Sequence, residues 1–144
     1  MRWFFVLTLM LASSALTQAK DGVILLHGLA RTAASMEKMK AALTDAGYIV
    51  ANIDYPSRTA PIAKLAEHTI SAALASEALR DCEHIHFVTH SLGGILVRSY
   101  FSEHTEPRLG RVVILGPPNR GSEVVDKLKS WTLFQSSTAP LVAN

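Results

Sequence analysis

The stretch THSLGG, residues 89–94, decides the fold of this chain. An apolar run precedes it and a helix-like run, 95–101, follows it, so we expect a strand to reverse into a helix at Ser91. Such a tight turn strains the backbone at its apex and needs a small residue nearby, which Gly93 supplies. A serine at this apex lies at a helix N-terminus, where free N–H groups favour negative charge. The stretch therefore predicts a serine positioned as a nucleophile.

A second motif, HGLA at residues 27–30, directly follows another apolar run, GVILL at 22–26. The two motifs, each after a predicted strand and in this order, resemble those of the α/β-hydrolase superfamily. The turn around Ser91, at residues 89–94, is called the nucleophile elbow in that superfamily. It differs from the usual Gly-x-Ser-x-Gly pattern, because Thr89 stands in place of the first glycine. Two motifs in the expected order indicate the fold far more specifically than either motif alone.

This resemblance implies a division of roles around the elbow. Ser91 would be the nucleophile that attacks an acyl carbonyl. The backbone N–H groups of Leu29 and Leu92 would donate hydrogen bonds to the oxyanion of the tetrahedral intermediate. Loops at the carboxyl ends of parallel strands form ligand crevices. The residues that we expect at the pocket rim lie on such loops: His27, Arg31, Tyr55 and Asn119.

A third stretch, GPPNRGSE at residues 116–123, resembles the Pro-His-Arg-Gly-Ser/Thr loop of bacterial triacylglycerol lipases. Asn119 stands where those lipases have histidine. Two interpretations of the loop therefore stay open: it lines the pocket, or it is a turn that caps the next helix. The resemblance to small bacterial lipases and esterases extends over residues 22–129.

Strand and helix patterns alternate along the chain. Apolar strands alternating with helices predict an α/β three-layer sandwich, a parallel sheet with helices on both faces. The resemblance implies about four strands in the order 2-1-3-4, an incomplete α/β-hydrolase fold. We expect strands at 22–26, 48–53, 84–89 and 111–115, and helices at 35–46, 61–79, from the elbow to residue 101, and at 122–129.

The N-terminus reads as a targeting segment. A positively charged start, MR, precedes an apolar stretch at 3–12 and small residues near Ala19. This pattern predicts a secretory signal peptide over 1–19, with cleavage before Lys20 and export to the periplasm or the medium. The alternative is an uncleaved anchor in the inner membrane. Residues 20–144 would form the hydrolase domain.

Composition excludes several classes of protein. Apolar residues make up 49% of the chain, which argues against disorder, and the formal net charge of +2 without a basic cluster argues against nucleic-acid binding. Cys82 is the single cysteine, so no disulfide framework is expected. His84 and His86 share a predicted strand face, but no third ligand is suitably spaced. We expect neither a metal nor another cofactor.

The sequence gives weaker signals for the base and the acid that would activate the serine. A serine hydroxyl needs a base, the base needs a carboxylate, and in α/β-hydrolases their chain order is serine, acid, histidine. The histidine downstream of Ser91 is His104, which a helix would place about 20 Å away. Glu123 is a candidate acid, although the commoner acid positions lie beyond Asn144. We therefore interpret the chain as roughly the N-terminal two-thirds of a small secreted hydrolase, without its acid and base.

Two classes of function stay open. The first is a serine hydrolase of carboxylic esters, lipase-like or esterase-like, whose acyl-enzyme could also serve acyl transfer. Its substrate would be a small-molecule ester or a lipid, reached through transient contact with a membrane or lipid surface. The alternative is a catalytically inactive hydrolase-fold fragment or a binding protein that uses the same cleft. A membrane-tethered interaction protein is a third option, which requires an uncleaved N-terminus.

Overall fold

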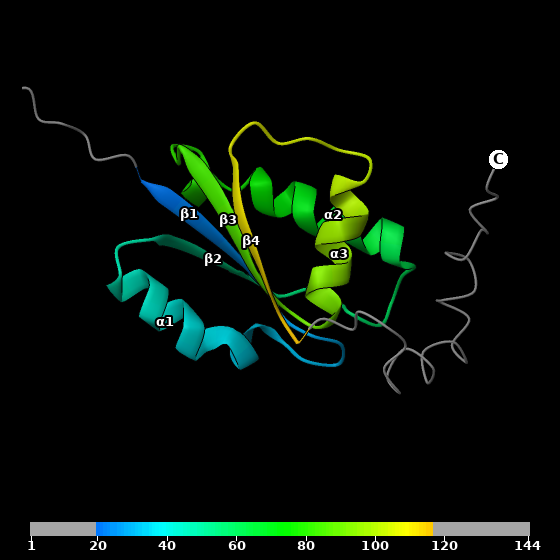
Figure 1. The fold of residues 1–144 in the computed structure, drawn as a ribbon. Helices are drawn as coiled ribbons and strands as arrows, with labels where there is room; N and C mark the ends of the chain where they lie inside the picture. The colour runs from blue at the N-terminus through cyan, green and yellow to red at the C-terminus, as the bar shows by residue number, and fades with distance from the viewer. Residues whose placement is uncertain (1–19, 117–144) are drawn as a thin grey trace, which may run out of the picture.

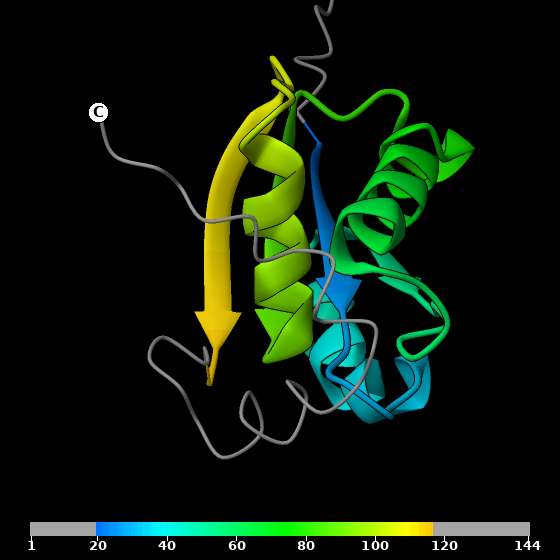
Figure 2. The same cartoon turned by 90° about the vertical axis from the view of Figure 1, so that its right-hand side faces the viewer.

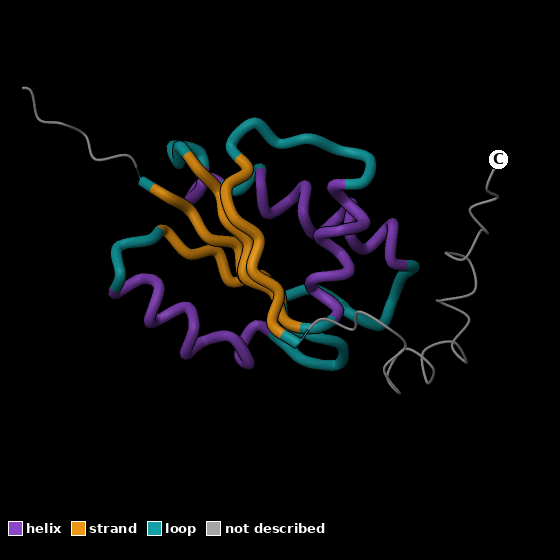
Figure 3. The backbone as a smooth tube through the Cα atoms, viewed as in Figure 1, coloured by secondary structure: helices purple, strands orange, loops and turns teal. Residues whose placement is uncertain are grey.

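The computed structural model describes residues 20–116 of the chain. Four parallel strands lie in the order β2-β1-β3-β4, with helices on both faces of the sheet (Figure 1). This confirms the predicted fold class and strand order. The strands are β1 (Asp21–Leu26), β2 (Ile49–Ile53), β3 (His84–His90) and β4 (Leu109–Leu115), drawn in orange in Figure 3. The helices are α1 (Glu37–Asp45), α2 (Ile62–Leu74) and α3 (Leu92–Phe101), with 3-10 turns at Ala33–Met36 and Glu77–Leu79.

The direction of the chain reverses at the centre of the sheet. From β1 the chain moves outward through α1 to β2, whereas α2 and α3 carry it in the opposite direction to β3 and β4. Because parallel crossovers are right-handed, this reversal places α1 on one face and α2 with α3 on the other (Figures 1 and 2). The loops that follow β1 and β3 therefore diverge at the carboxyl edge of the sheet, and such a switch point is where α/β folds bind ligands.

The core follows this layering. Ile24 and Leu26 of β1 pack into the larger apolar cluster with α2 and α3, whereas Val23 and Leu25 pack into a smaller cluster with Met36 beside α1. Successive strand residues point to opposite faces, so β1 is buried from both sides. Each such aliphatic side chain contributes about 1.5–3 kcal/mol by burial. This rigid central strand supports the loop that begins at its end.

The second long helix is shorter than the sequence pattern predicts. The apolar periodicity favours a helix over 61–79, but α2 ends at Leu74 and Ser76 is extended, with φ −62° and ψ 140°. The prediction was wrong because a distant residue stabilises the break. The guanidinium of Arg108 donates to the carbonyls of Leu79 at 3.0 Å and Leu74 at 3.5 Å. Glu106 orients that guanidinium, and the hydrogen bond holds the pKa of the Glu106 carboxyl below its usual range.

Strand β4 forms one edge of the sheet within residues 20–116. Its Val112, Val113 and Leu115 are 38%, 47% and 37% exposed, which leaves an apolar strip on this edge.

Within residues 20–116 no helix is long and apolar enough to cross a membrane. Cys82 is a free cysteine in a buried position, and burial raises the pKa of its thiol. The predicted signal peptide and the expected helix at 122–129 lie outside the described residues.

Candidate active site

Ser91 occupies the strained turn that the sequence predicts. Its backbone has φ 48° and ψ −108°, a region that residues with a Cβ rarely adopt. Two hydrogen bonds hold it there: the Ser91 N–H donates to the Leu115 carbonyl at 2.9 Å, and the Ser91 carbonyl accepts from the Gly94 N–H at 3.0 Å. The serine therefore lies at the junction of β3 and α3, immediately before the first residue of the helix.

Gly93 is required because α3 begins directly against the end of β1. A Cβ at Gly93 would lie 2.7 Å from the carbonyl oxygen and 2.8 Å from the Cβ of Leu26, closer than real Cβ contacts. Neither atom can move away easily, because both belong to a buried central strand. Thr89, in the position of the first motif glycine, is fully buried with its hydroxyl 3.5 Å from the Val113 carbonyl. A small β-branched residue thus fits at this position.

The loop after β1 lies against the elbow. A Cβ built on Gly28 would be 2.7 Å from the His90 ring and 3.5 Å from the Cβ of Ser91, so a larger residue here would require the His90 ring to move. The loop then turns at Ala30, which has φ 57°, and the Ala30 N–H donates to the Ser57 hydroxyl at 3.0 Å. These contacts bring the start of the HGLA loop, at Gly28, beside the serine.

Two backbone donors near the serine are free. In the described part of the chain, neither the Leu29 N–H nor the Leu92 N–H donates to an acceptor. Leu92 is the first residue of α3, where helix amides have no intrahelical partner. Leu29 follows Gly28 in the adjacent loop. Free amides on both sides of a serine are the arrangement that an oxyanion hole needs.

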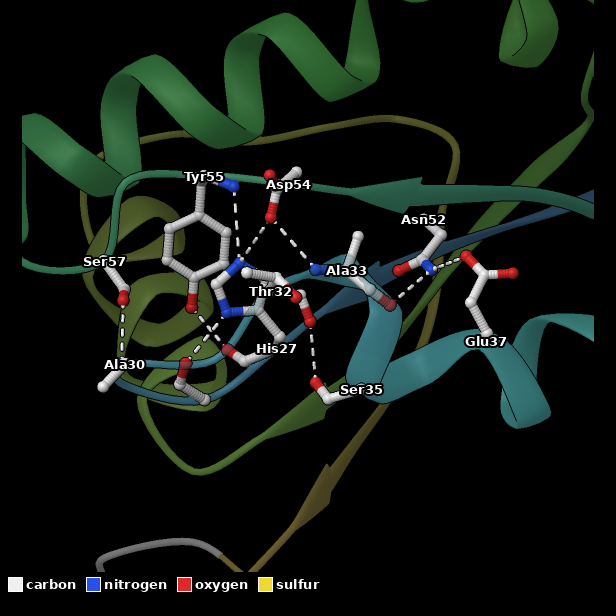
Figure 4. A network of polar contacts seen from close by, with 11 residues as sticks. His27, Ala30, Thr32, Ala33, Ser35, Glu37, Asn52, Asp54, Tyr55 and Ser57 are labelled. Carbon is white, nitrogen blue, oxygen red and sulfur yellow. Dashed lines mark hydrogen bonds and ion pairs between the residues drawn. The ribbon is translucent and has the colours of Figure 1, made fainter.

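His27 anchors the loop through both nitrogens of its ring (Figure 4). Its fully buried ring donates from Nδ1 to the Gly28 carbonyl at 2.8 Å, and its Nε2 accepts from the Tyr55 N–H at 3.3 Å. The ring also stacks on Tyr55, with centroids 4.1 Å apart, and the Tyr55 hydroxyl donates to the His27 carbonyl. Because both nitrogens are engaged within the fold, His27 holds the loop in place and is not a free base.

Asp54 links the loops after β1 and β2. Its Oδ1 accepts from the Ala33 N–H at 3.0 Å and lies 3.4 Å from Nε2 of His27. The same Nε2 also contacts the Tyr55 N–H at 3.3 Å, so the imidazole lies between the carboxylate and the backbone of the loop after β2. The carboxylate therefore shapes the loop, and the sequence signal for this is an acid directly after a strand.

A cleft of about 500 Å³ opens between these two loops. Arg31 and Tyr55, two of the residues expected at the pocket rim, lie on its wall together with Ser57 and Arg58. Tyr55 is only 5% exposed, and burial raises the pKa of its hydroxyl. Its main contact is therefore with His27. Asn119 and Glu123 lie outside the described residues.

No histidine of residues 20–116 is placed to activate the serine. His104 follows the far end of α3, where its Nδ1 donates to the Tyr100 carbonyl at 3.0 Å and its Nε2 lies 3.2 Å from Glu67. His27 is engaged in the loop, and the exposed ring of His90, the residue before Ser91, lies against Gly28 of the loop after β1. The expected separation of His104 from the serine agrees with this geometry.

His84 and His86 share the carboxylate of Asp21 at the opposite edge of the sheet. Their ring nitrogens lie 3.1 and 3.3 Å from its two oxygens. Nδ1 of His86 accepts from the Arg111 N–H at 2.8 Å, so both nitrogens of that ring are engaged. Hydrogen bonds from His86 and then His84 hold the pKa of the Asp21 carboxyl below its usual range. The described residues contain no group of three ligands that could hold a metal ion.

The sequence matches a known protein family. The model of the palmitoyl protein thioesterase family matches residues 22–142, which include the elbow and the HGLA loop. The chain belongs to this family. No curated protein matches the sequence. Membership agrees with the α/β-hydrolase superfamily that the two motifs resemble.

Solved structures share the fold at low identity. An extracellular α/β-hydrolase from a Paenibacillus species, described as a structural and functional homologue of tobacco salicylic acid binding protein 2, is 18% identical with a TM-score of 0.57, covering 79% of this chain and 48% of that one. Phospholipase PlaB from Legionella pneumophila is 20% identical, with TM-scores of 0.57 in complex with thio-NAD and 0.55 in a second structure. Those matches cover 75% and 80% of this chain but 27% and 30% of PlaB. The chain thus spans less than half the length of these structures.

Proposed function

We propose that this chain contributes the nucleophile and oxyanion hole of a serine hydrolase that cleaves thioesters or esters of lipid acyl groups. The observation that supports this is the strained Ser91 with the free amides of Leu29 and Leu92 beside it. The family name favours a thioester, and the PlaB likeness is consistent with a lipid substrate. Contact with a membrane or lipid surface would deliver such a substrate.

The chemistry follows from the geometry. Ser91 Oγ bonds to the acyl carbon while a base takes its proton, and the carbonyl oxygen becomes an oxyanion that the Leu29 and Leu92 amides stabilise. The carbon–sulfur or carbon–oxygen bond then breaks, and the leaving thiol or alcohol takes the proton from the base. Water hydrolyses the resulting acyl-serine by the same steps, releasing the carboxylic acid and restoring Ser91. Each oxyanion donor is worth about 10²–10³ in rate.

A second candidate function is binding without catalysis. It is favoured by one observation: within residues 20–116 no histidine lies where it could take the proton of Ser91. Without a base the serine hydroxyl is a weak nucleophile. The cleft and the free amides would then hold a carbonyl ligand without cleaving it.

Catalysis by the 144-residue chain requires that a fluorophosphonate probe label Ser91 stoichiometrically, because phosphonylation needs a base and an oxyanion hole as acyl transfer does, and no histidine of residues 20–116 supplies that base. Ser91→Ala should abolish the labelling, whereas Ser102→Ala, a hydroxyl lost at the far end of α3, should leave it unchanged. Labelled peptides identified by mass spectrometry, together with hydrolysis of an S-palmitoyl peptide, provide the measurement. A folded chain that stays unlabelled would contradict catalysis and leave the binding function.

We also propose that the chain is exported through residues 1–19. The extracellular Paenibacillus neighbour is consistent with export, and the charge and apolar pattern of the segment is that of a signal peptide. Protein recovered outside the cytoplasm should begin at Lys20 when its N-terminus is sequenced. An exported or membrane-bound protein that begins at Met1 would instead support the anchor.

A further inference from the structure

The loop that carries the Leu29 amide turns in a conformation that alanine does not favour. The Arg31 N–H donates to the Gly28 carbonyl at 3.2 Å and closes a four-residue turn. Leu29 and Ala30 are its two central residues, and of these only Ala30 has a positive φ, 57°. A turn with positive φ at its third residue alone is type II, in which glycine is preferred at that position. Alanine is strained there, and such strain persists only where surrounding contacts hold it.

The Ser57 hydroxyl holds this turn from the loop after β2. It accepts from the Ala30 N–H at 3.0 Å, although the two residues are 27 positions apart in the chain (Figure 4). In a type II turn the peptide between the two central residues is turned over relative to a type I turn. Because that peptide carries the Ala30 N–H, an acceptor fixed on one side of it selects the type II form. Ser57 is itself held in a turn, in which the Thr59 N–H donates to the Pro56 carbonyl at 3.1 Å.

The other contacts of the loop lie on either side of this turn. The hydrogen bonds of the His27 ring fix the residues before it, and the Ala33 N–H, bonded to Asp54, fixes the residues after it. Within residues 20–116 the bond to Ser57 is the one that engages the central peptide. The orientation of that peptide therefore depends on one hydroxyl group.

We propose that Ser57 is a positioning residue for the oxyanion hole. Its hydroxyl keeps Ala30 in the left-handed conformation and thereby directs the Leu29 amide at the acyl oxygen. This role rests on the proposed function, in which Leu29 donates to the oxyanion. Without the hydrogen bond, Ala30 relaxes toward the right-handed conformation that alanine prefers. The loop then loses the fixed orientation of its Leu29 amide beside Ser91.

The rate at which a fluorophosphonate labels Ser91 of the 144-residue chain tests this role, with imidazole added as an external base so that the absence of a suitable histidine does not limit the reaction. Ser57→Ala should lower the rate about tenfold, because one hydrogen bond biases the turn and an oxyanion donor contributes at least that factor. Ser57→Thr keeps the hydroxyl and should restore most of the rate. The matched control is Ser35→Ala, which removes a hydroxyl that donates to the Thr32 carbonyl and should leave the rate unchanged.

Ala30→Gly distinguishes positioning from direct contact with the probe. Glycine adopts a positive φ without strain, so in the Ser57→Ala background it should recover most of the labelling rate. A hydroxyl that acted by contacting the probe would not be replaced by a glycine elsewhere. Hydrogen exchange of the Ala30 amide is a second readout, which needs no chemistry at Ser91. It should be faster in Ser57→Ala and unchanged in Ser35→Ala.

The outcomes separate this role from the proposed function. Equal labelling rates for Ser57→Ala and Ser35→Ala would overturn the role of Ser57 and leave Ser91 as the nucleophile. No recovery by Ala30→Gly would show that Ser57 does not act through the turn. A folded chain that stays unlabelled even with imidazole would overturn the proposed function and the oxyanion role of Leu29 with it. Exchange of the Ala30 amide would still decide whether Ser57 fixes the turn.

Discussion

Replacing Gly93 by alanine is expected to lower the free energy of unfolding by about 3 kcal/mol. In an ordinary helix position the same change stabilises a protein by about 0.5–1 kcal/mol. Here the new methyl group would lie 2.7 Å from the Leu26 carbonyl oxygen and 2.8 Å from its Cβ. Relief requires α3 to move away from β1, which separates the Leu92 amide from the Leu29 loop. Fluorophosphonate labelling of Ser91 should therefore fall as well.

Gly47→Ala is the matched control. Gly47 has φ 95° and no atom within 4 Å of a built Cβ, so alanine there meets backbone strain without a clash. We expect a loss of about 1–2 kcal/mol. Urea unfolding followed by circular dichroism measures both variants. Gly93→Ala as stable as the unsubstituted chain would mean that α3 does not approach β1 this closely.

The second large effect is expected at His27. His27→Phe keeps a ring to stack on Tyr55 but leaves the Tyr55 N–H without its partner, and the Gly28 carbonyl keeps the Arg31 N–H alone. A buried polar group left unsatisfied costs about 1–3 kcal/mol, so we expect a loss of about 2 kcal/mol. The loop that carries the Leu29 amide should also become mobile. Hydrogen exchange of the backbone amides in this loop should therefore be faster than in the unsubstituted chain.

Tyr55→Phe separates the two contributions at this pair of rings. It removes the hydroxyl that donates to the His27 carbonyl and keeps both the stacking and the Tyr55 backbone bond. The expected cost is about 1 kcal/mol. If His27→Phe costs no more than Tyr55→Phe in urea unfolding, the imidazole hydrogen bonds do not hold the loop.

Much of the fold could be predicted from local pattern. The apolar runs before HGLA and THSLGG correspond to β1 and β3, and the helix after the elbow ends at Phe101 as expected. The failure came at α2, where periodicity continues to Leu79 but the helix ends at Leu74. Its break is stabilised by Arg108, a residue 34 positions along the chain from Leu74. A window of neighbouring residues contains no information about such a contact.

The candidate site likewise has features that the sequence predicts and features that it does not. Ser91 and its strained turn were predictable, because a small residue after the serine and a flanking strand and helix are local requirements. The anchoring role of His27 was not, since it depends on a backbone N–H from Tyr55, which belongs to a different crossover.

By itself the sequence determined the order of strands and helices, the burial of the central strands and the position of the serine elbow. These features follow from side-chain periodicity and from the conformations that short segments can adopt. Only the tertiary structure decided that Gly28 lies against Ser91 and that Asp54 joins two loops. The physical reason is that such contacts join residues from separate crossovers, whose spacing is set by how the layers pack.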